Sequence, residues 1–146
     1  MLVLCTANSA RSQMAEGWLR QLAAEVGLPL EAHSAGLRAT RVHPQAIAAM
    51  AEVGIDISGH TSKALSDLPD PWSFDDVITV CDNANEACPN YPAKSRRRHY
   101  PFPDPAGQPD EPDAFRRVRD QERPMFAAFV AALAAGRESP PGPALT

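Results

Sequence analysis

The sequence predicts an α/β fold, a single three-layer domain in which helices flank a short parallel sheet of about four strands. Short apolar runs rich in β-branched residues alternate along the chain with longer segments whose apolar residues recur every three or four positions. This alternation is typical of parallel strands joined by right-handed helical crossovers. The length of 146 residues suits one domain with its own core.

The first half of the chain contains two strand and two helix candidates. The apolar run Met1–Leu4 predicts a short buried strand, and residues 30–34 predict a second one, closed by the alanine and glycine that follow. Between them, Ser12–Val26 carries apolar residues every four positions, which predicts a helix packed on the core. A second helix is expected after His43, because proline follows at the first helical position and Gly54 can end the helix.

The second half predicts two more strands and a long helix. We expect Ser62 to cap a short helical turn that ends at Leu65. The β-branched run Asp76–Val80 is the clearest strand, and 97–100 is a candidate for the last one. Residues 113–135 predict the last helix, which its internal proline should kink or split.

Composition limits the class of protein. We place one domain at residues 1–136 and expect a flexible, proline-rich tail at 137–146. The net charge of −4 gives no general attraction to nucleic acid, and the basic cluster at 94–98 is interpreted as the solvated edge of a strand. No apolar run is long enough to span a membrane, and no signal-peptide pattern precedes the first strand. We expect a cytoplasmic monomer that binds neither nucleic acid nor membrane.

The loop between the first strand and the first helix is the strongest candidate site. Cys5 is followed after five residues by Arg11 and Ser12, at the point where a strand meets a helix N-terminus. Loop N–H groups and the helix dipole favour an oxyanion, and a guanidinium can hold two of its oxygens. We expect Cys5 to act as a thiolate nucleophile that Ser12 stabilises. The expected substrate-binding residues are Thr6, Ala7, Asn8, Ser9, Ala10 and Arg11.

Other residues suggest supporting roles. Asn8 suits a left-handed turn position, and its amide can tie the loop together. Displacement at an oxyanion centre needs an acid, and Asp104, held between two prolines, is the candidate, with an ordinary turn aspartate as the alternative. The four histidines lack metal-ligand spacing, so we expect no metal and no other cofactor. His43 is interpreted as a helix cap and His60 as a loop residue.

These motifs resemble a known family. The residues from Cys5 to Ser12 are similar to the active-site loop of low-molecular-weight protein tyrosine phosphatases. The longer string through Trp18 resembles the thioredoxin-coupled arsenate reductases, which share that fold. The resemblance covers nearly the whole chain to about residue 133. Further matches lie at 34–36, 54–62, 104–106 and 115–120.

The other two cysteines favour the reductase. Cys81 and Cys88, seven positions apart, match the relay cysteines of that group. The resemblance implies that Cys5 attacks arsenate, with Asp104 as proton donor, and that Cys81 then attacks the Cys5 sulfur as arsenite leaves. Cys88 then attacks Cys81, and thioredoxin reduces the resulting disulfide. The alternative is that Cys81 is a buried strand-end residue and Cys88 a free surface thiol.

Two further functions stay open. A phosphatase of the same fold would need only Cys5 and Asp104, and weak phosphatase activity is expected in either case. A non-catalytic oxyanion-binding or thiol-sensing protein is the third possibility. Ala106 replaces a tyrosine found in many of the phosphatases.

One departure concerns a cation. Some relatives bind potassium near the loop through an aspartate and three other residues, and Lys63 stands at the position of that aspartate. We expect the Lys63 ammonium to replace the ion. The three other matching positions are Asn8, Glu16 and Ser34.

Overall fold

The computed structural model describes residues 1–82, 90–92 and 94–136 of the chain, and the expected tail lies outside these residues. Four parallel strands form one sheet with the order β2-β1-β3-β4. The strands are β1 (Leu2–Cys5), β2 (His33–Gly36), β3 (Asp76–Thr79) and β4 (Arg96–His99). The helices are α1 (Arg11–Glu25), α2 (Pro44–Glu52) and α3 (Glu111–Ala134), with one 3-10 turn, η1 (Leu65–Asp67). The predicted α/β class with a four-stranded parallel sheet is confirmed.

The order of the strands places the ends of β1 and β3 at the centre of the sheet. From β1 the chain moves outward to β2 on one side, and it then returns to β3 on the other side. In open parallel sheets, ligands bind outside the carboxyl ends of the strands, at the point where the order of the strands reverses. The loop after β1 and the segment after β3 therefore begin side by side, at the position where a site is expected.

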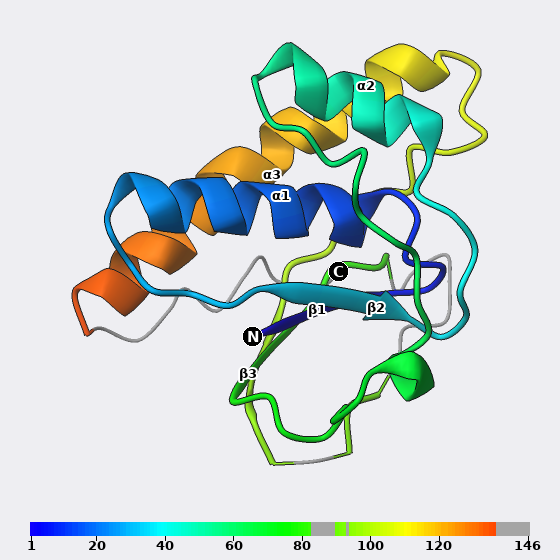
Figure 1. The fold of residues 1–146 in the computed structure, drawn as a ribbon. Coiled ribbons are helices and arrows are strands. Elements are labelled where there is room, and N and C mark those ends of the chain that lie inside the picture. The colour runs from blue at the N-terminus through cyan, green and yellow to red at the C-terminus, as the bar shows by residue number, and fades with distance from the viewer. Residues whose placement is uncertain (83–89, 93, 137–146) are drawn as a thin grey trace.

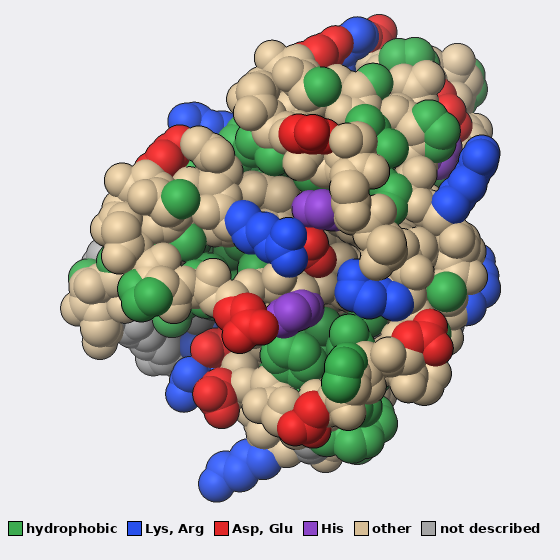
Figure 2. All heavy atoms as spheres, in the orientation of Figure 1, with side chains coloured by type: hydrophobic (Ala, Val, Ile, Leu, Met, Phe, Trp, Pro, Cys, Tyr) green, Lys and Arg blue, Asp and Glu red, His purple; other side chains and the backbone are tan. Residues whose placement is uncertain are grey.

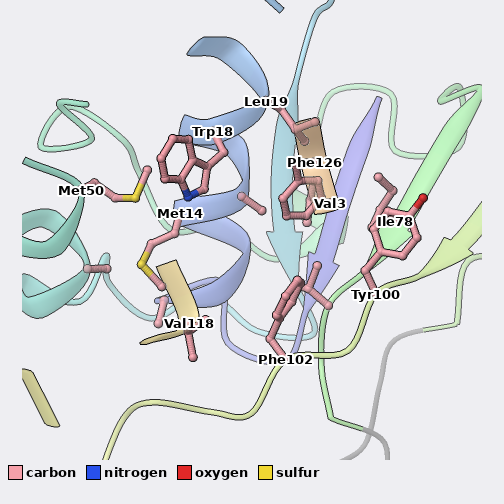
Figure 3. Close-up of a cluster of buried hydrophobic side chains, with 14 of the residues drawn as sticks. Val3, Met14, Trp18, Leu19, Met50, Ile78, Tyr100, Phe102, Val118 and Phe126 are labelled. Carbon is pink, nitrogen blue, oxygen red and sulfur yellow. The ribbon is translucent and has the colours of Figure 1, made fainter. Parts of the chain in front are cut away.

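The described helices lie together on one face of the sheet (Figure 1). Helix α1 packs on β1 and β2 and against α3, and α2 packs on both helices. Figure 3 shows the resulting core, in which Trp18 and Met14 of α1 meet Val118 and Phe126 of α3 above Val3 of β1. The opposite face of the sheet is covered by η1 and the loop that follows it. The site thus rests on a rigid, close-packed layer.

Strand β2 begins three residues later than the sequence suggests. Its register is set by β1, because Leu2 pairs with His33 and Cys5 pairs with Gly36. The expected closing residues, Ala35 and Gly36, are therefore part of the strand. Their small side chains carry little strand propensity, so pairing and not local preference defines this element.

Two other expectations need correction. Ser62 does not cap the turn, because its hydroxyl accepts a hydrogen bond from Thr40 N–H and donates to Ala7 O, and η1 begins only at Leu65. Pro124 does not split α3, which is continuous from Glu111 to Ala134. Pro124 is exposed, while Phe126, Phe129 and Val130 in the following turns remain buried in the core.

Charged side chains of both signs are mixed on the surface, as the sequence predicts. Figure 2 shows acidic, basic and histidine side chains interspersed over one face, without a large patch of one sign. The basic cluster lies on β4 at the edge of the sheet, where Arg96 binds Asp76 of β3 through two hydrogen bonds of 2.9 Å. Within the described residues, no helix has the length and apolar character needed to cross a membrane.

Candidate active site

The candidate nucleophile lies at the junction between β1 and α1. Cys5 is the last residue of β1, and the first residue of α1 is Arg11; both are buried, with exposed fractions of 2% and 4%. We call residues 5–12 the oxyanion loop. Asn8 has a φ of 47°, so the loop contains the left-handed residue that the sequence suggests. The loop thereby wraps in front of the N-terminus of α1, where the free N–H groups and the dipole favour an anion.

The Cys5 sulfur accepts hydrogen bonds inside the loop. Its Sγ lies 2.8 Å from Ser12 Oγ and 3.3 Å from the backbone nitrogen of Asn8, whose N–H donates to it. The Asn8 side-chain amide donates to Ser12 Oγ at 2.9 Å. The Ser12 hydroxyl oxygen accepts this hydrogen bond from the Asn8 amide, and the hydroxyl proton can be donated to the Cys5 sulfur. Both donors stabilise the thiolate form of Cys5.

Asn8 is the centre of a fully used hydrogen-bond network. Its Nδ2 donates to Ser12 Oγ and, at 2.9 Å, to Ser34 Oγ on β2. Its Oδ1 accepts from Gln13 Nε2 and from the backbone N–H of Lys63, both at 2.9 Å. A buried amide with every donor and acceptor used fixes one loop conformation. The loop is therefore preorganised before any ligand binds.

Gln13 extends this network to the loop before η1, a role that no sequence signal indicates. Its Nε2 faces three oxygens, Asn8 O, Asn8 Oδ1 and Thr61 O, which fixes the orientation of the amide. Its Oε1 lies 3.0 Å from His60 Nδ1, so this nitrogen carries a proton and donates it. Burial lowers the pKa of His60, which favours the neutral ring in this position.

The expected role of Lys63 is wrong. Its ammonium does not take the place of a bound cation, because Nζ donates instead to Thr61 O at 3.0 Å. The carboxylate of Glu16 has other partners: Ser34 Oγ donates to it at 2.8 Å and Arg20 lies at 3.2 Å. His60 Nδ1 lies 3.4 Å from the same carboxylate. Arg20 supplies the positive charge locally, and no group of acidic, histidine or cysteine residues in the described part of the chain could hold a metal ion.

Gly36 and Thr40 hold the oxyanion loop from outside, and no sequence pattern indicates either contact. A Cβ on Gly36 would lie 2.7 Å from Thr6 O and 2.8 Å from Asn8 N, so the loop backbone occupies the space of a side chain. Thr40 Oγ1 donates to Ala7 O at 2.9 Å. The close approach explains why β2 ends in glycine.

Arg11 and Asp104 meet across the mouth of the loop. Arg11 Nη1 donates to Phe102 O at 3.2 Å, and Nη2 lies 4.0 Å from Asp104 Oδ2. Asp104 Oδ1 accepts from Ala106 N–H, as in a turn aspartate, while the side chain is 54% exposed. Asp104 can be both a turn residue and a catalytic acid, since one carboxylate oxygen holds the turn and the other faces Arg11.

The pocket at this position is small. It has a volume of about 240 Å³ and brings Cys5, Arg11 and Asp104 together. None of the lining residues in the described part of the chain is aromatic, and Ala106 lies among them. The other lining residues are Ala7, Ser9, Ala10 and Thr40.

Cys81 lies two residues beyond the end of β3 and is fully buried. It is disulfide-bonded, whereas Cys5 is a free cysteine, so the two are not joined to each other in this structure. Val80 N–H donates to Leu4 O at 2.9 Å, which continues the β1–β3 ladder to the residues just before Cys5 and Cys81. Cys88 lies outside the described residues.

Comparison with known proteins agrees with this geometry. The model of the low molecular weight phosphotyrosine protein phosphatase family matches residues 1–138. Arsenate reductase 2 of Staphylococcus epidermidis is 44% identical over 126 residues, which are 86% of this chain and 92% of the relative. A solved structure described as an arsenate reductase in the phosphate binding state has a TM-score of 0.75 at 37% identity, over 89% of this chain and 95% of that one. Another, described as an arsenate reductase in oxidized state, has a TM-score of 0.75 at 36% identity, over 90% and 96%.

Proposed function

Because the chain belongs to the low molecular weight phosphotyrosine protein phosphatase family, we propose that its oxyanion loop serves the reduction of arsenate to arsenite. One observation carries the proposal: Cys5 ends β1, and Cys81 lies two residues beyond the end of the neighbouring parallel strand β3. Adjacent strands lie about 5 Å apart. A phosphate-ester hydrolase needs the Cys5 nucleophile but has no use for a second cysteine at the next strand end.

In the first step the Cys5 thiolate attacks the arsenic of a bound arsenate. A sulfur–arsenic bond forms and an arsenic–oxygen bond breaks, and Asp104 donates a proton so that the oxygen leaves as water. Arg11 and the loop N–H groups neutralise the remaining oxygens. The Ser12 hydroxyl lies 2.8 Å from the Cys5 sulfur, where it can donate a hydrogen bond to the attacking thiolate.

In the second step the Cys81 thiolate attacks the Cys5 sulfur. The sulfur–arsenic bond breaks, its electron pair stays on arsenic, and arsenite leaves while the two thiols become a disulfide. Cys81 lies two residues beyond β3, the strand beside β1, and is disulfide-bonded in this structure, so the relay requires it to be reduced before it attacks Cys5.

The last step regenerates Cys5. Cys88 attacks Cys81, Cys5 leaves as a thiolate, and thioredoxin reduces the Cys81–Cys88 disulfide with its own dithiol. The free Cys5 and the disulfide-bonded Cys81 of this structure support such a product state. A phosphatase activity is the second candidate, which the position of Asp104 beside Arg11 favours as a slow side reaction.

The test compares both reactions on the same protein. We expect arsenate-dependent NADPH consumption with thioredoxin and thioredoxin reductase, and only slow hydrolysis of an aryl phosphate. Cys5→Ser is expected to abolish both. Fast ester hydrolysis without arsenate reduction would assign the chain to the phosphatases, and anion binding with neither activity would favour a sensor.

The size of the pocket provides a separate check of substrate class. Ala106→Tyr adds a ring at the mouth of the pocket, where it can stack on an aromatic ester but does not touch the sulfur. We expect aryl-phosphate hydrolysis to rise several-fold in kcat/KM while arsenate reduction does not improve. An unchanged ratio of the two activities would contradict the argument from pocket lining.

A further inference from the structure

A buried carboxyl lies beneath the oxyanion loop and has no part in the steps above. Glu122 of α3 is 0% exposed, and neither of its oxygens accepts a hydrogen bond from any residue that the structure describes. A buried carboxylate without donors is costly, so such a group is expected to hold a proton or to serve a function. No sequence pattern indicates its burial, because a glutamate in an amphipathic helix is normally solvent-exposed.

The neighbours of Glu122 place it behind the loop. Val118 and Phe126, one helical turn before and after it, both pack in the core between α1 and α3 (Figure 3). The Phe126 ring lies 6.2 Å from that of Phe102, and Phe102 O accepts the hydrogen bond from Arg11. Glu122 therefore lies in the packed layer that contains Phe102, whose carbonyl oxygen holds the Arg11 guanidinium.

Two charged groups act on this carboxyl from the elements packed against α3: Arg11 at the start of α1 and Cys5 at the end of β1. Burial is the largest influence and raises the pKa of Glu122 well above its usual range. The positive charge of Arg11 opposes this rise, and a negative charge on Cys5 adds to it.

The other charged groups nearby are engaged elsewhere. Arg119, one turn earlier on α3, binds Glu52 of α2 and Asp120. Arg123, the next residue of α3, lies over the Trp18 ring at 5.8 Å. Arg11 is thus the cation to which an ionised Glu122 would couple.

We propose that Glu122 is a positioning residue of the oxyanion site. The Glu122 carboxyl holds a proton while the site binds anions, and anion binding weakens when that proton is lost. The neutral carboxyl leaves the charge of Arg11 to the Cys5 thiolate and to the bound oxyanion. An ionised carboxyl adds a buried negative charge that acts on Arg11 and repels the bound anion in a low-dielectric environment. The coupling is reciprocal, so a bound anion strengthens the hold of Glu122 on its proton.

The test follows phosphate binding against pH and does not depend on arsenate reduction. Iodoacetamide alkylates Cys5 of the fully reduced chain, and inorganic phosphate bound at the site slows this reaction. The phosphate concentration needed for protection gives the affinity for phosphate, which is measured from pH 6 to 10. Glu122→Gln and Glu122→Leu cannot ionise, so we expect equal affinity for all three proteins near pH 6. At the alkaline end we expect the wild type to bind phosphate about tenfold more weakly than either variant.

A matched control removes an exposed carboxylate from the same helix. Asp113→Asn, at a side chain that is 67% exposed and paired with Arg116, should keep the wild-type pH profile. Glu122→Leu also keeps the test valid if the glutamine variant folds poorly, because an apolar side chain removes the unpartnered oxygens and should raise the unfolding temperature. Identical pH profiles for all four proteins would overturn the proposal.

Infrared spectroscopy tests the protonation state directly. The infrared difference spectrum between wild type and Glu122→Gln at pH 7 should contain the carbonyl stretch of a protonated carboxylic acid. Added phosphate should keep that band present at higher pH. Absence of the band, or tighter phosphate binding by Glu122→Gln at every pH including 6, would show an ionised Glu122 and refute the proposal. If the wild type and the Glu122 variants differ in the pH dependence of phosphate binding but the protein does not reduce arsenate, the result would count against the reductase function alone.

Discussion

Replacement of Gly36 by alanine provides a quantitative test of the preorganised loop. The new Cβ would lie 2.7 Å from Thr6 O, 2.8 Å from Asn8 N and 3.1 Å from Ala7 C. All three are backbone atoms, so no side-chain rotation can relieve the overlap. Ordinary contacts begin near 3.4 Å, and the loop must therefore move away from β2 by about 0.7 Å.

That movement is large compared with the tolerance of the site. Asn8 N–H donates to Cys5 Sγ at 3.3 Å, so a displacement of Asn8 disturbs this hydrogen bond, and the N–H groups no longer converge on one anion. Misplacement of this order costs about 100-fold in rate. Overpacking should in addition lower the free energy of unfolding by about 1–3 kcal/mol.

The assay measures kcat/KM for arsenate reduction and for aryl-phosphate hydrolysis, with unfolding by urea to confirm that Gly36→Ala is folded. Both activities should fall by a similar factor, because both use the same loop. Gly59→Ala is the control, since a Cβ there meets nothing within 4 Å. Wild-type activity in Gly36→Ala would refute the reasoning that the close approach of the loop to β2 sets its geometry.

Two further predictions concern the thiolate and acid stability. Ser12→Ala removes a hydrogen bond to Cys5 and should slow alkylation of Cys5 by iodoacetamide at pH 6 about tenfold, and an unchanged rate would exclude Ser12 as a donor. The guanidinium groups of Arg116 and Arg119 lower the pKa of Glu52 to about 2, so its contribution to stability is present above about pH 4.5 and is lost as the pH falls toward 2. Glu52→Gln should flatten the loss of urea-unfolding stability between pH 5 and 2, and equal slopes would contradict this.

Local patterns were enough to predict most of the fold and the candidate nucleophile. The run Asp76–Val80 is β-branched, and the helix after Ser12 has regular apolar spacing, so each element is determined by its own residues. The spacing from Cys5 to Arg11 identifies an oxyanion loop because a strand end and a helix start must flank it.

Long-range contacts account for what the sequence did not reveal. Strand β2 is positioned by pairing with β1 and by the space that Gly36 leaves for the loop. The ammonium of Lys63 is directed by its bond to Thr61 O, which no spacing indicates. The burial of Glu122 depends on how α3 packs against α1, and no local pattern distinguishes it from an exposed glutamate.

The central claim, that Cys5 and Cys81 act in sequence on one arsenate, is tested most directly by a single-turnover measurement. Cys88→Ser, fully reduced and mixed with excess arsenate, should release one arsenite per chain and stop, and peptide mass spectrometry should then find a Cys5–Cys81 disulfide. With thioredoxin as the only reductant, the same variant should show no sustained NADPH consumption. Continued turnover by this variant, or arsenite release without that disulfide, would contradict the relay.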